Sequence, residues 1–136
     1  MNEDNKILAK YWIEKSYKAL DSAKLSFEQN FYETTMNRLY YSAFYMVNAY
    51  LQIEGISYRK HSAVRSFFNK KFIKGNLLEK DYGNIYNRLY QIREEADYSI
   101  IFDIEKDKVE WYINQTEKLI KEMEKIVKDK LNKELK

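Results

Sequence analysis

A guanidinium, an amide and two phenols lie close together in segment 37–45 of this chain. Arg38, Tyr41 and Tyr45 are spaced i, i+3 and i+7, so a helix would bring the cation and both rings to one side. Asn37 precedes Arg38 and can hydrogen-bond to the same groups. Burying a guanidinium is costly unless it is paired. The segment therefore predicts a buried polar network or one wall of an anion site, with a rim position for Arg38 as the simpler alternative.

A second arginine lies in the stretch with the most regular helical periodicity. Arg93 and Asp97 are four residues apart, which places them on one side of that helix. One interpretation is an ordinary helix ion pair, worth about 0.2–0.5 kcal/mol. The other is a guanidinium that holds a phosphate with two hydrogen bonds, while Asp97 orients it or competes with the ligand. The spacing alone does not choose between them.

The single histidine, His61, follows Arg59 and Lys60 at the start of a short predicted helix. Residues 55–78 contain six Lys and Arg side chains and no acid. Such a segment can attract phosphates or an acidic partner, although an ordinary solvated lysine face has the same composition. A lone histidine is more often structural than catalytic. We therefore expect a structural role for His61, with phosphate steering by this basic patch as the alternative.

These candidate residues must be positioned by helices. Apolar residues recur every three or four positions, and the chain has no proline and only three glycines. Helices are expected at about 5–29, 31–54, 60–72, 79–98 and 103–132, with Asn30 and Glu33 forming a capping box. The expected fold class is all-α: an up-and-down four-helix bundle with one additional short helix. A single domain would span 1–136, with a frayed end at 131–136.

The composition excludes several kinds of site. There is no cysteine, no Glu-x-x-His motif and no glycine-rich phosphate loop, which argues against disulfides, thiolate or di-metal centres and P-loops. We expect no metal and no cofactor. The N-terminal residues do not resemble a signal peptide, and no apolar run approaches the ~20 residues of a membrane span. A cytoplasmic protein without a membrane contact is therefore expected.

Three motifs, taken in order, resemble the HEPN superfamily and in particular its small stand-alone prokaryotic branch. They are Asn37-Arg38-x-Tyr40-Tyr41-x-x-Phe44-Tyr45, Lys60-His61-Ser62 and Arg93-x-x-Ala96-Asp97-Tyr98. The motifs cover about 31–102, and the helix order fits over the whole chain. The resemblance implies a helical homodimer with a functional groove near the two-fold axis. It also implies a minimal nucleotidyltransferase as partner, often within a toxin–antitoxin pair.

The resemblance also implies roles for residues. Many members are metal-independent ribonucleases in which an arginine is followed, a few residues later, by a histidine. Arg93 matches the arginine, but Tyr98 stands in the histidine's place, and an unperturbed phenol titrates near pH 10 rather than near neutrality. We therefore expect catalysis by Arg93 and Tyr98 to be lost or weak. The residues expected to bind nucleotide or RNA are Arg38, Asn37, Tyr41, Arg93, Asp97, His61, Arg59 and Lys60.

The main functional expectation is thus a dimeric protein that binds nucleotide, RNA or a nucleotidyltransferase partner. Tyr98 is also a candidate for modification by that partner. Two alternatives stay open: a metal-independent endoribonuclease that uses Arg93 and Tyr98, with or without His61, and a purely structural dimeric scaffold.

Overall fold

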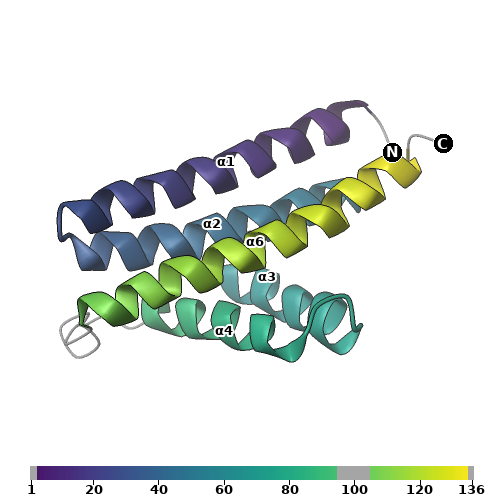
Figure 1. Cartoon of the computed structure of the whole chain (residues 1–136). Coiled ribbons are helices and arrows are strands. Elements are labelled where there is room, and N and C mark those ends of the chain that lie inside the picture. The colour runs from purple at the N-terminus through teal and green to yellow at the C-terminus, as the bar shows by residue number, and fades with distance from the viewer. Residues whose placement is uncertain (1–2, 95–104, 135–136) are drawn as a thin grey trace.

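The computed structural model describes residues 3–94 and 105–134 of the 136-residue chain. Within these residues the fold is all-α, as predicted (Figure 1). The elements are α1 (Glu3–Glu28), α2 (Tyr32–Ile53), α3 (His61–Phe68), η1 (Asn69–Lys74), α4 (Lys80–Glu94) and α6 (Lys106–Glu134). None of these helices is long and apolar enough to cross a membrane.

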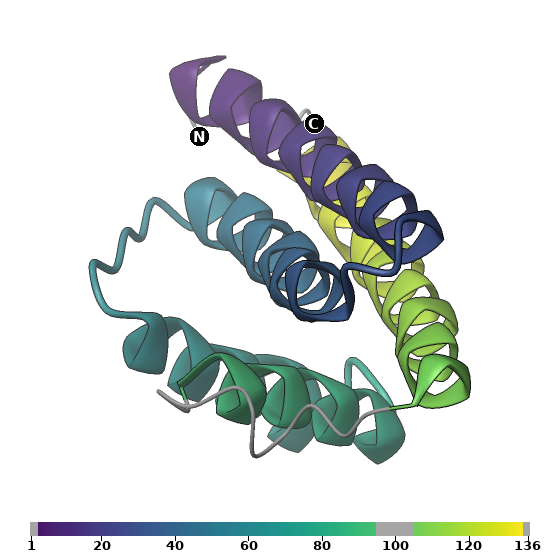
Figure 2. The ribbon, with the colours of Figure 1, turned by 90° about the vertical axis from the view of Figure 1, so that its left-hand side faces the viewer.

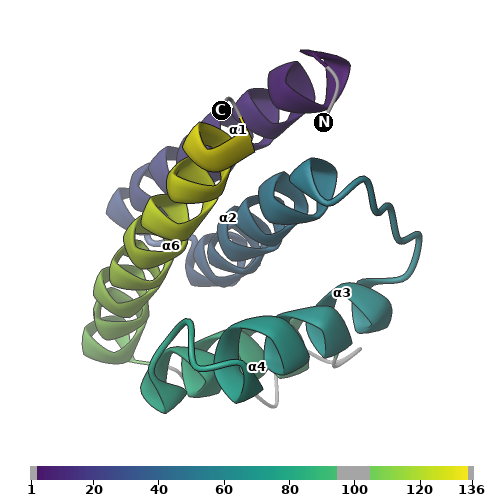
Figure 3. The same cartoon turned by 90° about the vertical axis from the view of Figure 1, so that its right-hand side faces the viewer.

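Helix α2 lies at the centre of the molecule. In Figure 2 it has α1 and α6 on one side and the layer formed by α3, η1 and α4 on the other. Figure 3 shows the same order from the opposite direction, with an extended connection leading from α2 to α3. This position agrees with a helix that is apolar around most of its circumference. Leu39, Tyr40, Ala43 and Met46 of α2 are fully buried.

Small side chains hold α1 and α2 close together. The hydroxyl of Ser16, which is fully buried, donates to the backbone carbonyl of Ser42 at 2.6 Å. Near the turn between the two helices, the hydroxyls of Ser26 and Thr35 lie 2.9 Å apart. A hydroxyl can approach a neighbouring backbone more closely than a longer side chain allows. These contacts fix the relative position of α1 and α2 along their length.

The capping box predicted at the start of α2 is wrong. The residue before the first helical turn is Phe31, and no side chain among the described residues caps this helix end. Asn30 has φ 63°, in the left-handed region, and its side-chain oxygen accepts a hydrogen bond from the hydroxyl of Tyr32. Asparagine tolerates this conformation better than most residues, so Asn30 turns the chain instead of capping the helix.

Two other helices differ from the prediction, and the predicted end of α4 falls outside the described residues. The helix expected over 60–72 is α3 followed by one π-helical stretch, η1. Helix α6 continues past Leu131, where fraying was expected, to Glu134. Helix α4 is described to Glu94, so Asp97 and Tyr98 lie outside the described residues. Gly55, with φ 73°, ends α2 as expected.

Candidate functional site

His61 is enclosed by aromatic side chains of α2. Its Nδ1 atom lies 2.8 Å from the hydroxyl of Tyr40, which is fully buried. The ring of Phe44 stacks on the imidazole with centroids 4.2 Å apart and an interplanar angle of 5°. The ring of Tyr41 meets it edge-on at 5.7 Å. One hydrogen bond and contacts with the rings of Tyr40, Tyr41 and Phe44 therefore hold the imidazole in one orientation at the first residue of α3.

The surroundings of His61 favour its neutral form. Burial lowers the pKa of His61 below its ordinary value of 6.5, and the positive charge of Arg93 lowers it further, while Glu94 opposes both. Burial raises the pKa of Tyr40 far above its ordinary value of 10.0, so this phenol stays protonated. A protonated phenol can donate to the unprotonated Nδ1 of a neutral imidazole. We assign Tyr40 as the donor, which places the His61 proton on Nε2.

Arg93 lies in the last turn of α4 and reaches the same aromatic rings. Its guanidinium carbon is 5.7 Å from the ring centroid of Tyr40 and 5.9 Å from that of Tyr41. Its Nη1 atom donates to a carboxylate oxygen of Glu94 at 2.6 Å. Burial acts to lower the pKa of Arg93, but the contacts with Tyr41, Tyr40 and Glu94 outweigh it and raise that pKa. The guanidinium therefore remains cationic, and Glu94 competes with any anion that approaches it.

Arg38, Asn37 and Tyr41 do meet on one side of α2. The Nε and Nη2 atoms of Arg38 donate to the side-chain oxygen of Asn37 at 3.2 and 2.9 Å. The guanidinium carbon of Arg38 lies 4.9 Å from the ring centroid of Tyr41. Arg93 of α4 approaches the same ring from another helix. Two guanidinium groups thus lie against one phenol, all three side chains half-buried.

The aromatic surface continues from α2 onto α1. Tyr41 contacts Tyr45 with centroids 5.6 Å apart, and Tyr45 contacts Trp12 of α1 at the same separation. The Nζ atom of Lys15 lies 4.6 Å from the ring centroid of Tyr45. The helical spacing of Arg38, Tyr41 and Tyr45 indicated their common side, but nothing local indicated that α1 would add a tryptophan and a lysine. We call the surface from Arg38 to Lys15 the cation–aromatic strip.

The basic residues on either side of His61 in the sequence make fewer contacts with the site. Arg59 and Lys60 are exposed in the turn before His61, and Lys60 is the residue before the first turn of α3. Arg65 belongs to the basic patch that was expected to steer phosphates, although it was not among the residues expected to bind nucleotide or RNA. Its Nε atom donates to Asn87 at 2.8 Å, and its guanidinium carbon lies 4.6 Å from the ring centroid of Tyr90. The signal was available, since Arg65 follows His61 by four residues and so shares its side of α3.

These groups can bind an anion and exchange a proton. Two guanidiniums supply charge and hydrogen-bond donors, and a half-buried neutral imidazole supplies an acid–base group. Within 3–94 and 105–134, no three His, Asp or Glu side chains cluster in a way that could hold a metal ion. The guanidiniums and the imidazole are groups of the kind that can bind phosphate and transfer a proton.

A comparison with known protein families matches the part of the chain that carries these side chains. The family model of the HEPN domain matches residues 9–126. The chain belongs to the HEPN domain family. The matched range contains Arg38, His61 and Arg93 together with the helices that carry them. The family resemblance inferred from the three motifs is thereby confirmed.

Relatives of this HEPN protein include proteins of Thermotoga maritima and Methanocaldococcus jannaschii. A Thermotoga maritima protein named "UPF0332 protein" is 36% identical over 129 residues, covering 95% of this chain and 97% of its own length. Methanocaldococcus jannaschii has a protein named "Putative toxin MJ0142", 35% identical over 115 residues and covering 79% and 78%. A second protein of that archaeon, "Putative toxin MJ0605", is 28% identical over 129 residues and covers 90% and 96%.

Proposed function

We propose that this HEPN protein is the RNA-binding toxin component of a toxin–antitoxin-type module, and that Arg93 and Arg38 bind an RNA phosphate. One observation carries the proposal: two guanidiniums from different helices lie against the Tyr41 ring, at 4.9 and 5.9 Å. Arginine suits a phosphodiester because its planar fork matches two phosphate oxygens. The names of the two archaeal relatives support the toxin role.

An RNA strand fits this surface better than a free nucleotide does. In the cation–aromatic strip, the neighbouring rings of Tyr41 and Tyr45 lie between two cations, Arg38 of α2 and Lys15 of α1. A single nucleotide has one base and would use only part of this strip. Successive bases of a single strand stack on successive rings, while neighbouring cations hold the phosphates. The proposed ligand is therefore single-stranded RNA.

The proposed assembly follows the family resemblance. We expect a homodimer that brings two copies of the Arg93 site near its two-fold axis, and a minimal nucleotidyltransferase as the partner protein. Light scattering on the purified protein tests the first expectation, which fails if the mass is that of one chain.

The binding test compares two arginines of one helix. Labelled single-stranded RNA is titrated with wild-type protein, Arg93→Ala and Arg88→Ala in EDTA at several salt concentrations. Arg88 is a matched control because it is exposed on α4 and hydrogen-bonds to Gln91. For a single strand, the slope of log K against log salt changes by about 0.7 for each phosphate that the protein no longer neutralises. Arg93→Ala should weaken binding and flatten the slope by about this amount, whereas Arg88→Ala should leave both unchanged.

The same titration can contradict the proposal. RNA binding that is equally strong in Arg93→Ala and wild type would place the RNA elsewhere. A loss of binding in Arg88→Ala equal to that in Arg93→Ala would indicate general charge attraction rather than a site.

A second candidate function is metal-independent RNA cleavage, and one observation favours it. His61, an acid–base group, contacts the side chains of Tyr40 and Tyr41, and the guanidinium of Arg93 lies over the rings of the same two residues. In such a reaction a base removes the proton of the ribose 2′-hydroxyl, and the 2′-oxygen bonds to phosphorus. The bond from phosphorus to the 5′-oxygen breaks, and an acid protonates that oxygen. His61 would supply one of these proton transfers, and Arg93 would stabilise the charge on the phosphate.

Cleavage is tested with RNA in EDTA, with DNA of the same sequence as the control. The expected products carry a 2′,3′-cyclic phosphate, and DNA stays intact because it lacks the 2′-hydroxyl. His61→Gln should abolish cleavage and leave RNA affinity within about twofold, since binding rests on the guanidiniums. Cleavage that persists in His61→Gln would contradict this second candidate but leave the binding proposal intact.

A further inference from the structure

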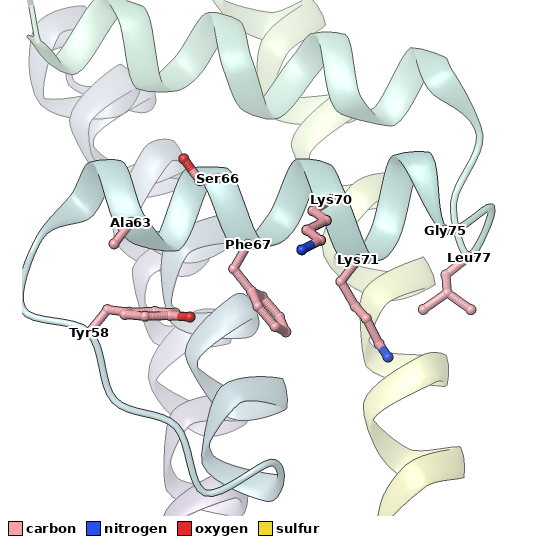
Figure 4. Close-up of a pocket in the computed structure, with 8 residues that line it drawn as sticks. All are labelled: Tyr58, Ala63, Ser66, Phe67, Lys70, Lys71, Gly75 and Leu77. Atoms are coloured by element: carbon pink, nitrogen blue, oxygen red, sulfur yellow. The ribbon is translucent and has the colours of Figure 1, made fainter.

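A separate groove runs along one side of α3 and η1. Its volume is about 730 Å³, and Figure 4 shows the side chains that line it. Tyr58, Phe67, Lys71 and Leu77 lie on the same side of the helix, whereas the hydroxyl of Ser66 points away from them. The lining residues are Tyr58, Ala63, Ser66, Phe67, Lys70, Lys71, Gly75 and Leu77. None of them belongs to the site around Arg93 and His61.

The groove has an apolar floor that is open to solvent. The ring of Phe67 contacts Tyr50 at 6.0 Å and Tyr58 at 6.4 Å, so it is anchored on the bundle. Tyr58 and Leu77 are 40% and 43% exposed, at opposite ends of the groove in Figure 4. Large apolar side chains that share one exposed hollow are typical of a surface that another molecule covers.

The cations beside this floor have no acidic partner among the described residues. Lys70 and Lys71 line the groove and Lys74 follows in η1, yet none of the three forms an ion pair within the part of the chain that the structure describes. Several lysines of α6 differ, because Lys121 and Lys128, for example, each pair with a glutamate one turn away. Residues 55–78 contain no acid at all. The positive charge at the groove is therefore left for a partner to neutralise.

The shape of the groove fits a helix. Ala63, Phe67 and Lys71 follow each other at intervals of four along a nearly continuous helix of 14 residues, His61–Lys74. Such a stripe is the surface against which a second helix packs its own i, i+3, i+4 and i+7 side chains. The last part of this helix is π-helical, and π-helical turns occur frequently at functional sites.

We propose that this groove binds an amphipathic helix of a partner protein, in which Asp or Glu residues flank a face of leucine-like side chains. The partner's apolar face would cover Phe67, Tyr58 and Leu77, and its carboxylates would pair with Lys70 and Lys71. A second copy of this chain is a poorer occupant, since a two-fold contact would bring these lysines against each other. RNA is also a poorer occupant, because the apolar side chains of Ala63 and Leu77 offer its bases no ring on which to stack. The proposal does not depend on the RNA-binding function.

The test uses designed peptide probes and NMR. The first probe is a helical peptide of about three turns with leucines at i, i+3, i+4 and i+7 and glutamates beside them. The second probe replaces every glutamate with lysine. We expect the acidic peptide to shift the resonances of Tyr58, Phe67 and Leu77. The double substitution Lys70→Glu/Lys71→Glu should weaken the affinity for this peptide by at least about tenfold.

Matched variants make the outcome decisive. Lys118→Glu/Lys125→Glu, two exposed lysines of α6, gives the same change of net charge and should leave the acidic peptide's affinity within about twofold. Leu77→Ser should weaken the peptide without unfolding the protein, because Leu77 is exposed. Arg93→Ala should not change peptide binding, which separates this proposal from the RNA site.

Several results would overturn the proposal. The first is an acidic peptide that binds wild type with a Kd of about 1 mM or weaker. The second is an acidic peptide whose Kd is the same for Lys70→Glu/Lys71→Glu as for wild type. The third is a lysine peptide that binds as tightly as the acidic peptide. The fourth is a set of resonance shifts that map to residues outside the groove. Single-stranded RNA that shifts Tyr58 and Leu77 when the acidic peptide does not would assign the groove to nucleic acid instead.

Discussion

Replacing Tyr40 with phenylalanine tests how the imidazole of His61 is positioned. The substitution removes only the hydroxyl that lies 2.8 Å from Nδ1, and the fully buried ring keeps its packing. A hydrogen bond of this kind contributes about 0.5–1.5 kcal/mol to the free energy of unfolding. We expect Tyr40→Phe to lower that free energy by about 1 kcal/mol, which lowers Tm by about 4 °C for a domain of this size.

The same substitution should change the titration of His61. Because Tyr40 donates to the neutral imidazole, losing the hydroxyl disfavours the neutral form, and the lowered pKa of His61 should rise. His61 is the only histidine, so its Cε1–H resonance is assigned without mutagenesis. The assay is an NMR pH titration of that resonance combined with urea unfolding of wild type and variant.

Tyr17→Phe is the matched control. The hydroxyl of Tyr17 donates to Glu124 at 2.6 Å, between α1 and α6, so this variant also loses one hydrogen bond. It should lower stability without changing the His61 titration. If Tyr40→Phe leaves both stability and the His61 pKa unchanged, or lowers that pKa, the assignment of Tyr40 as the donor is wrong.

Three further predictions concern pH and packing. Because the folded-state pKa of His61 lies below its ordinary 6.5, the unfolded chain binds a proton at this residue first as the pH falls. The free energy of unfolding should therefore decrease as the pH drops below about 6.5, and it should decrease less steeply in His61→Gln. Urea unfolding at several pH values measures both. Thr116→Val should leave stability unchanged or raise it by up to about 1 kcal/mol, since the buried Thr116 hydroxyl has no hydrogen-bond partner among the described residues; a marked loss of stability in urea unfolding would show that the hydroxyl is hydrogen-bonded after all. Gly83→Ala should lower the free energy of unfolding by about 1–3 kcal/mol although alanine has the better helix propensity, because the new Cβ would lie 2.9 Å from Cγ1 of Ile73. The loss should be smaller in an Ile73→Ala background. An equal loss there would refute the steric cause.

The helices could be predicted from the sequence because their signals are local. Periodic apolar residues and scarce turn residues act within a few positions of one another. The errors occurred where two local signals compete. Asn30 can cap a helix or adopt a left-handed turn, and the structure has the turn. The change from α3 to π-helical η1 at Asn69 has no local signature, since the same residues would also continue an α-helix.

The candidate site was predictable only where it lies on one helix. Arg38 and Tyr41 meet because their spacing on α2 requires it. The sequence also marked Arg93 through the family motif. It did not indicate that Glu94 would pair with Arg93, or that Arg65 would lie over Tyr90. Each of these contacts depends on side-chain directions near the end of a helix, which the backbone pattern leaves open.

The sequence by itself determined an all-α bundle and one helix side that carries Arg38, Tyr41 and Tyr45, because helical spacing alone specifies them. The sequence placed His61 among the expected binding residues only through the family resemblance, and the tertiary structure decided which side chains hold its imidazole. Its contacts with Tyr40 and Phe44 join residues that are 21 and 17 positions apart. They depend on where the connection between α2 and α3 returns the chain, and that path is set by packing of the whole bundle rather than by local preference.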